Sequence, residues 1–136
     1  MINKNWIKAD LRISSLEFTP SEITNILSKE PTESAEKGRL MSPKNPKSQR
    51  IERNGWFLSS GLPDNASLEK HLDILLEFIA SKQMEFNKLE KKCDIDIFCG
   101  LSIKGGQGTF SLSADLMKKL SFFPLEVIFD LYVEED

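Results

Sequence analysis

Apolar and polar residues alternate along three separate stretches of the chain, at residues 6–14, 94–103 and 125–134. Successive side chains of a strand point to opposite faces, so this period of two predicts three half-buried strands. A long helix that carries Leu72, Leu75 and Ile79 is expected to cover their apolar face. The strand residues expected to be buried beneath it are Ile7, Leu11, Ile97, Leu101, Phe129 and Leu131.

Helical spacing of apolar residues occurs in three other stretches. The sequence Thr19-Pro20-Ser21-Glu22 has an N-cap, a proline at the first helical position and a capping-box glutamate, which predicts a helix to about residue 28. A leucine-rich pattern predicts the long helix over residues 67–91, bent near Ser81. Ser113 is expected to cap a third helix that continues through Leu120.

Turn signals occupy the part of the chain between the first and the long helix. The dipeptide Asn54-Gly55 favours a two-residue turn, which predicts a hairpin over residues 49–60. Before it, residues 36–53 contain six lysines and arginines against two glutamates, a local charge of +4. Because prolines, serines and asparagine interrupt this stretch without any period, we expect a mobile basic loop over residues 36–50.

Together these elements favour an α+β fold with a largely antiparallel sheet, helices packed on one face, and the other face open. The chain has 136 residues, a length typical of one domain, so residues 1–136 are expected to form a single domain.

Composition excludes several classes of protein. No apolar stretch approaches the ~20 residues that span a bilayer, and residues 1–6 lack a signal sequence, so a cytoplasmic protein is expected. Cys93 and Cys99 are too far apart to pair within one strand, which predicts free thiols. One histidine and no Cys-x-x-Cys pair leave no zinc-site spacing, and an acidic pI of about 5.3 argues against nucleic-acid binding.

Catalytic signatures are missing as well. His71 is the single histidine, and its place beside the apolar stripe of the long helix predicts a boundary residue rather than a general base. The segment Gly105–Thr109 lacks the Lys-Ser/Thr pair of a phosphate-binding loop. We therefore expect a non-enzymatic protein with no catalytic residues, no metal and no cofactor.

Aromatic and charged residues share the open face of the predicted sheet, and a buried aromatic or arginine can anchor a protein partner. The acidic carboxyl-terminal end, residues 126–136, would complement a basic partner. The residues that we expect to bind a partner are Trp6, Asp10, Arg12, Asp96, Asp130 and Tyr132.

Short motifs occur in order along nearly the whole chain: Thr19-Pro-Ser-Glu-Ile-Thr24, Glu30-Pro-Thr32, Lys37-Gly38, Gly55-Trp-Phe-Leu-Ser-Ser60, His71-Leu72 and Phe129-Asp-Leu-Tyr132. This order resembles the bacterial family called domain of unknown function 4279. Small bacterial families of this kind are sometimes found as immunity proteins beside secreted toxins, so the resemblance implies a neutralising, protein-binding role. It supplies no catalytic residues. Within the matched motifs, the residue types that exceed what folding requires are those of Lys37, Trp56, His71, Asp130 and Tyr132.

Two functions remain open at this point. The first is a cytoplasmic protein-binding module, with an immunity protein bound to a basic toxin domain as its specific form. The alternative is a domain, which could be an enzyme, that binds a small anionic ligand or a nucleotide beneath the basic loop. Its candidate ligand-binding residues are Lys37, Arg39, Trp56 and His71.

Overall fold

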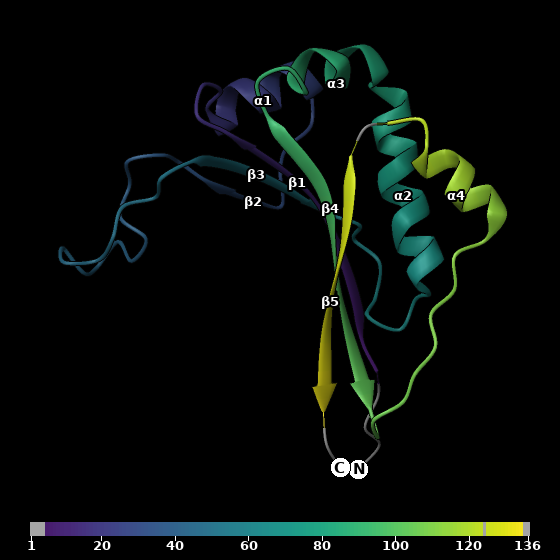
Figure 1. The fold of residues 1–136 in the computed structure, drawn as a ribbon. Helices are drawn as coiled ribbons and strands as arrows, with labels where there is room; N and C mark the ends of the chain where they lie inside the picture. The colour runs from purple at the N-terminus through teal and green to yellow at the C-terminus, as the bar shows by residue number, and fades with distance from the viewer. Residues whose placement is uncertain (1–4, 124, 135–136) are drawn as a thin grey trace. The chain divides into compact units, whose positions relative to one another are not determined.

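Five strands form one sheet, and the alternating stretches of the sequence supply the three longest of them (Figure 1). A computed structural model describes residues 5–123 and 125–134. The strand order is β2-β3-β1-β4-β5. The strands are β1 (Ile7–Ser15), β2 (Glu33–Ala35), β3 (Asn54–Ser59), β4 (Asp94–Lys104) and β5 (Glu126–Glu134).

The expected α+β class with a mostly antiparallel sheet is confirmed. One pairing differs, because β5 runs parallel to β4, with Asp96 opposite Glu126 and Lys104 opposite Glu134. Parallel neighbours need a long crossover connection, and the segment between these two strands contains a helix and supplies it. The short strand β2 has no counterpart among the strands predicted from the sequence.

Helices begin where the sequence provides caps. Thr19 accepts a hydrogen bond from the amide of Glu22, and the Glu22 side chain returns one to the Thr19 amide, so the predicted capping box is present. The Ser113 side chain caps the last helix by accepting a hydrogen bond from the Leu116 amide. The long helix is broken at Lys82 rather than merely bent. The helices are α1 (Pro20–Leu27), α2 (Leu68–Ser81), α3 (Gln83–Leu89) and α4 (Ala114–Leu120).

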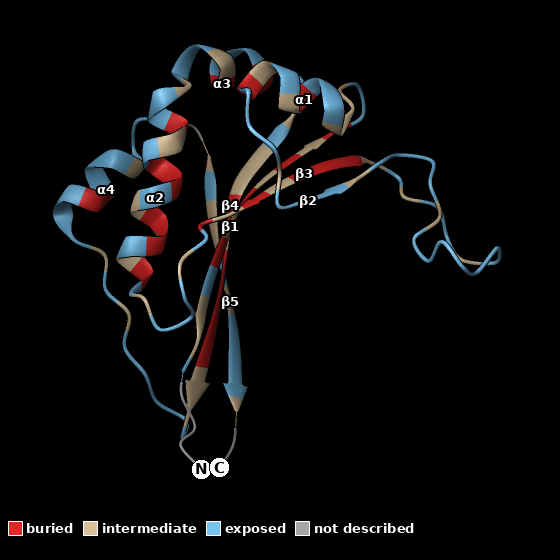
Figure 2. Ribbon diagram, turned by 180° about the vertical axis from the view of Figure 1, so that it is seen from behind, coloured by how far each residue is buried: buried red, intermediate tan, exposed pale blue. Residues whose placement is uncertain are grey.

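The chain divides into two compact units, and β1 and β4 each contribute residues to both. Unit 1 consists of Met1–Leu11, Ser59–Ser81 and Asp96–Asp136. Helix α4 lies against α2, where Lys119 pairs with Asp73 at 2.9 Å. Figures 1 and 2 show both helices on one side of the strands of this unit. Its buried apolar side chains are those of Ala9, Leu11, Leu68, Leu72, Leu75, Leu76, Ile79, Ile97, Cys99, Leu101 and Leu116.

Unit 2 consists of Arg12–Leu58 and Lys82–Ile95. Its buried apolar side chains are those of Ile13, Ile23, Leu27, Trp56, Leu58, Phe86 and Leu89. Trp56 is wholly buried, and its indole N–H donates to the Thr24 hydroxyl at 3.0 Å.

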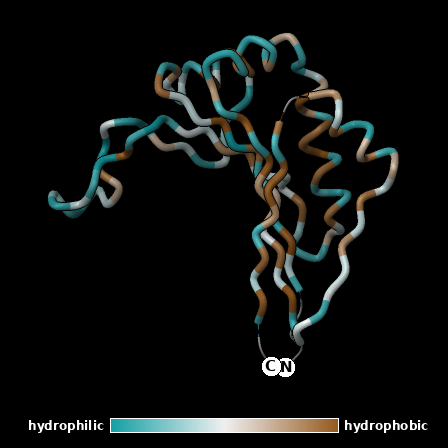
Figure 3. The backbone as a smooth tube through the Cα atoms, viewed as in Figure 1, coloured by the Kyte–Doolittle hydropathy of each residue, from teal (hydrophilic) through white to brown (hydrophobic). Residues whose placement is uncertain are grey.

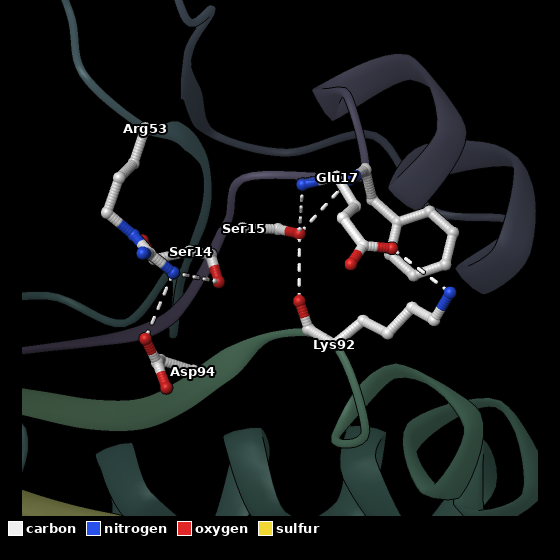
Figure 4. A network of polar contacts seen from close by, with 7 residues as sticks. Ser14, Ser15, Glu17, Arg53, Lys92 and Asp94 are labelled. Atoms are coloured by element: carbon white, nitrogen blue, oxygen red, sulfur yellow. Dashed lines mark hydrogen bonds and ion pairs between the residues drawn. The ribbon is translucent and has the colours of Figure 1, made fainter.

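A network of polar contacts joins the strand ends of unit 2 (Figure 4). The buried Ser15 hydroxyl donates to the Lys92 carbonyl at 3.0 Å and accepts from the amides of the next turn. Arg53 donates to the Ser14 hydroxyl at 2.7 Å and pairs with Asp94 at 3.0 Å. Arg53 therefore has a structural role and does not belong to a free basic surface.

The stretch from Gly38 to Ile51 folds back on itself. The amide of Gly38 donates to the Ile51 carbonyl, and the amide of Met41 donates to the Gln49 carbonyl, both at 2.8 Å. Leu40 and Arg50 form an antiparallel bridge between the two arms. The basic segment is thus a hydrogen-bonded hairpin in the structure, while its mobility in solution stays a prediction.

The predicted turn at Asn54-Gly55 is wrong. Both residues lie at the start of β3, and the Asn54 side chain accepts a hydrogen bond from the Lys37 amide at 2.9 Å. Gly55 has no positive φ, and a Cβ there would lie 2.6 Å from a ring carbon of Phe57. The glycine serves close packing of an aromatic ring, a need that the dipeptide itself does not reveal.

Burial of the predicted core face is confirmed for Leu11, Ile97 and Leu101 and is wrong for β5. Phe129 and Leu131 are 42% and 53% exposed, and Ile7 is only half-buried. The parity was correct, because Phe129 and Leu131 line the same hollow as Leu101 and Leu68 of α2. The helices do not extend over this edge strand, so its apolar face stays open.

A candidate protein-binding surface on β5

The two faces of β5 present different chemistry within unit 1. On one face, the rings of Trp6 and Tyr132 lie 5.2 Å apart at 44° to one another. They meet above Gly100, where a Cβ would lie 3.2 Å from the Trp6 ring. The absence of a side chain at this position of β4 lets both rings lie on the strand. Tyr132 nevertheless remains 45% exposed.

Charged groups surround this aromatic pair. The Lys8 ammonium lies 5.7 Å from the centre of the Trp6 ring, within the range of a cation–π contact. A hydrogen bond from the Tyr132 hydroxyl to Asp130 raises the pKa of the tyrosine. Tyr132 therefore stays neutral at physiological pH.

The opposite face of β5 opens into an apolar hollow of about 300 Å³. Its residues come from β4, β5, the start of α2 and the segment that follows β4, and all of them are apolar. They are Leu68, Leu101, Phe110, Leu112, Phe129 and Leu131. Figures 2 and 3 show β5 as a strand that is largely exposed and yet has hydrophobic stretches, and Val133 is 63% exposed.

Charge is divided unequally between the two units. Unit 1 contains 6 lysines and arginines against 12 aspartates and glutamates, a net charge of -6. Unit 2 contains 12 against 9, a net charge of +3. The overall charge of -3 conceals this division. The exposed apolar strand β5 thus belongs to the acidic unit.

Five of the six residues predicted to bind a partner belong to the same compact unit. Trp6, Asp10, Asp96, Asp130 and Tyr132 all belong to unit 1, whereas Arg12 belongs to unit 2. Trp6, Asp10, Asp96 and Asp130 are half-buried, and Tyr132 is exposed. Glu135 and Asp136, the end of the acidic segment, lie outside the described residues.

The residues of the alternative ligand site are divided between the two units, with three of the four in unit 2. Lys37 and Arg39 are exposed, and Arg39 is paired with Glu36 at 2.7 Å. Trp56 is wholly buried in the core of unit 2, so its ring offers no face to a ligand. His71 belongs to the other unit. Arg50 also donates within the hairpin, to the Gly38 carbonyl at 2.7 Å.

His71 is buried and is not the boundary residue that its sequence position predicts. Its Nδ1 lies 2.6 Å from the Ser60 hydroxyl, which also accepts a longer contact from the Leu62 amide. Burial lowers the pKa of His71, against the smaller opposing effects of the Pro63 carbonyl and Asp64. With both side chains buried, the Ser60–His71 pair stabilises the turn after β3 and is closed to a substrate.

The cysteines are free, as the sequence predicts. Burial raises the pKa of Cys99 to about 12 and also raises that of Cys93. Both thiols are therefore poor nucleophiles at neutral pH. Among residues 5–123 and 125–134, no three histidine, cysteine or acidic side chains gather as metal ligands, and no helix is long and apolar enough to span a membrane.

A family model described as Domain of unknown function (DUF4279) matches residues 5–134. The chain belongs to this family. No curated protein and no solved structure matches the chain. The match to DUF4279 covers both units and confirms the resemblance drawn from the order of the short motifs.

Sequence reasoning missed the hollow beside β5 within this DUF4279 domain. It assigned Phe129 and Leu131 to the core. One signal was present: β5 is apolar at Ile128 and Tyr132 on one parity as well as at Phe129 and Leu131 on the other. A strand that is apolar on both parities, without a further element to cover it, indicates an interface.

Proposed function

We propose that the chain is a protein-binding module that recognises a basic partner through the β5 surface of unit 1. The observation that carries the proposal is the exposure of Tyr132 beside Trp6 and Asp130 in a unit with a net charge of -6. Tyrosine and tryptophan are enriched among the few residues that dominate interface energies. A preformed ring pair loses little conformational entropy when a partner covers it.

The acidic residues of unit 1 would act on the rate at which the partner associates. Opposite charges on two proteins accelerate their encounter, and salt screens this attraction over a Debye length of ~8–10 Å. Asp130 supplies charge at the centre of the surface, next to the aromatic contact. Affinity would therefore come chiefly from Tyr132, and the rate of association from the carboxylates.

Within this class, we propose the neutralisation of a bacterial toxin domain in the cytoplasm. The expected cytoplasmic role is supported by two free thiols, of which that of Cys99 is buried, since free cysteines are typical of reducing compartments. A carboxylate-rich surface would suit a toxin that binds nucleic acid, because such a domain presents lysines and arginines. A module of this kind needs no catalytic group, in keeping with a buried His71 and Ser60.

The proposal is tested with the protein encoded next to this gene as the candidate partner. Wild-type protein should bind it, and Tyr132→Ala should weaken binding by ~2 kcal/mol or more, mainly through faster dissociation. Tyr132→Phe keeps the ring and should bind nearly as well. Phe122→Ala is the matched control, since Phe122 is a 75% exposed aromatic residue of the same unit.

Asp130→Asn should slow association at low ionic strength and leave dissociation almost unchanged. Neutralisation is measured separately, by co-expressing the partner with each variant and following growth. Equal binding by wild type and Tyr132→Ala, with both proteins folded, would contradict the proposed surface. Binding without protection of growth would support a protein-binding module and contradict the neutralisation of a toxin.

A further inference from the structure

We propose that β5 holds its partner by strand addition, and that the added segment is an extended peptide in which apolar residues alternate with lysine or arginine. The inference rests on the proposed function, because it specifies how the basic partner is bound. It concerns the outer edge of β5 and the apolar hollow, whereas the proposed function rests on the Tyr132 face.

The backbone of β5 is paired with another described strand on one edge only. β5 is the last strand of the sheet, and its pairing with β4 runs from Glu126 to Glu134. No other described strand pairs with its outer edge. Edge strands present a row of unpaired N–H and C=O groups, and proteins commonly protect them with proline, lysine, bulges or covering segments. The sequence of β5 contains neither proline nor lysine, so its edge favours the addition of another strand.

The apolar face of β5 would determine every second side chain of an added strand. Alternate side chains of an added strand would point to the face of Phe129 and Leu131, within ~5–8 Å of their Cβ atoms. That face opens into the hollow of about 300 Å³, which Leu101, Leu68 and the segment at Phe110 also line. Apolar side chains of the partner would enter it and become buried. The hollow therefore requires an apolar residue at every second position of the added strand.

The other face supplies the charge pattern. Intervening side chains of the added strand would lie beside Ile128, Asp130 and Tyr132, which have the opposite parity. Asp130 is the carboxylate at the centre of this face, and Glu134 is already paired with Lys104. Lysine or arginine at these positions would complement Asp130 and the net charge of unit 1. Its long side chain can also cover the exposed ring of Tyr132.

A second copy of the chain fits the same edge less well. When two β5 strands overlap along their full length in antiparallel orientation, Asp130 faces Asp130 and Glu126 faces Glu134. Like charges directly opposite one another destabilise a strand pair. The same association would also bring together two units of charge -6. A basic segment removes both costs, so we assign the edge to a partner of opposite charge.

The experiment uses a labelled peptide of nine residues, in which five valines alternate with four lysines, and the full-length protein. Fluorescence anisotropy should show saturable binding of this peptide. A peptide that alternates valine with glutamate, and a valine–lysine peptide of the same composition without alternation, should each bind at least about tenfold more weakly, or ~1.4 kcal/mol.

Backbone pairing is tested by N-methylation of alternate amides. Neighbouring N–H groups of a strand point to opposite edges, so methylation of one parity should abolish binding while methylation of the other parity should preserve it. If both methylated peptides bind like the parent peptide, the contact involves side chains alone and strand addition is refuted. This readout needs no protein variant and is independent of any effect on folding.

The role of the hollow is tested with Leu131→Lys, which should weaken binding of the valine–lysine peptide at least about tenfold. Leu16→Lys is the matched control, because Leu16 is also 53% exposed but belongs to unit 2. Unchanged binding by Leu131→Lys would overturn the inference. So would a wild-type dimer in sedimentation analysis that Leu131→Lys disperses, because a second copy would then occupy the edge.

Failure of this inference is separable from failure of the proposed function. Loss of the natural partner with Tyr132→Ala, together with no binding of the alternating peptide, would overturn strand addition and retain the protein-binding module. Binding of the peptide with the pattern described above, even when Tyr132→Ala keeps its natural partner, would support the edge site and reject the Tyr132 surface.

Discussion

The solvent exposure of the apolar face of β5, which carries Phe129 and Leu131, can be tested by the same substitution at two paired positions of neighbouring strands. Leu101 and Leu131 are direct partners in the parallel ladder, and both line the same hollow. They differ in exposure, since Leu101 is 1% and Leu131 is 53% exposed. Leu101→Ala should cost about 2–5 kcal/mol of unfolding free energy, because it removes buried methyl groups and leaves a cavity.

Leu131→Ala should cost much less. The substitution removes about three carbon groups, each contributing roughly 0.8 kcal/mol when buried, and about half of this contribution is already lost to solvent in the wild type. The expected loss is therefore about 1 kcal/mol, with no cavity cost because the site is open.

Urea unfolding of the two variants and the wild type gives both values from the transition midpoints, provided that the slopes agree. The measurement should be made at two protein concentrations, so that burial of Leu131 in an oligomer would be noticed. Equal losses for the two substitutions in a monomer would refute the argument that β5 presents an open apolar face.

Three further predictions concern pH, thiol reactivity and helix capping. Because burial lowers the pKa of His71, the unfolded chain binds its proton more readily, and the free energy of unfolding should decrease as pH falls below about 6.5. Urea melts over a pH series should show this decrease, and His71→Gln should remove that component; an unchanged profile would contradict the assignment. The Cys99 thiol, with its pKa raised to about 12, should react with a thiol reagent at pH 8 only as fast as the protein unfolds, and rapid labelling of native Cys93→Ser protein would disagree. Thr19→Ala should lower stability by ~1 kcal/mol in urea melts while Thr19→Ser should retain most of it, so equal losses would exclude the hydroxyl as the cap.

The local structure of this protein could be derived from its sequence to a large extent. Alternation with a period of two located β1, β4 and β5, because successive side chains of a strand point to opposite faces. The caps at Thr19 and Ser113 were found because a cap depends on a few neighbouring residues. The order of short motifs was also sufficient to identify the family.

Features that depend on contacts distant in sequence were not accessible in this way. Asn54-Gly55 has the composition of a turn, but the Lys37 amide and the Phe57 ring hold it in a strand. His71 was expected at a boundary, and the Ser60 hydroxyl that allows its burial comes from a different element.

The candidate site shows the same division. The sequence determined which residues of β5 share a face, because parity is a local property of a strand. Only the tertiary structure decided that β5 is an edge strand parallel to β4 and that α2 and α4 leave Phe129 and Leu131 uncovered. Whether an apolar strand becomes core or interface depends on which other segments reach it, and the period of its own residues contains no information about their reach.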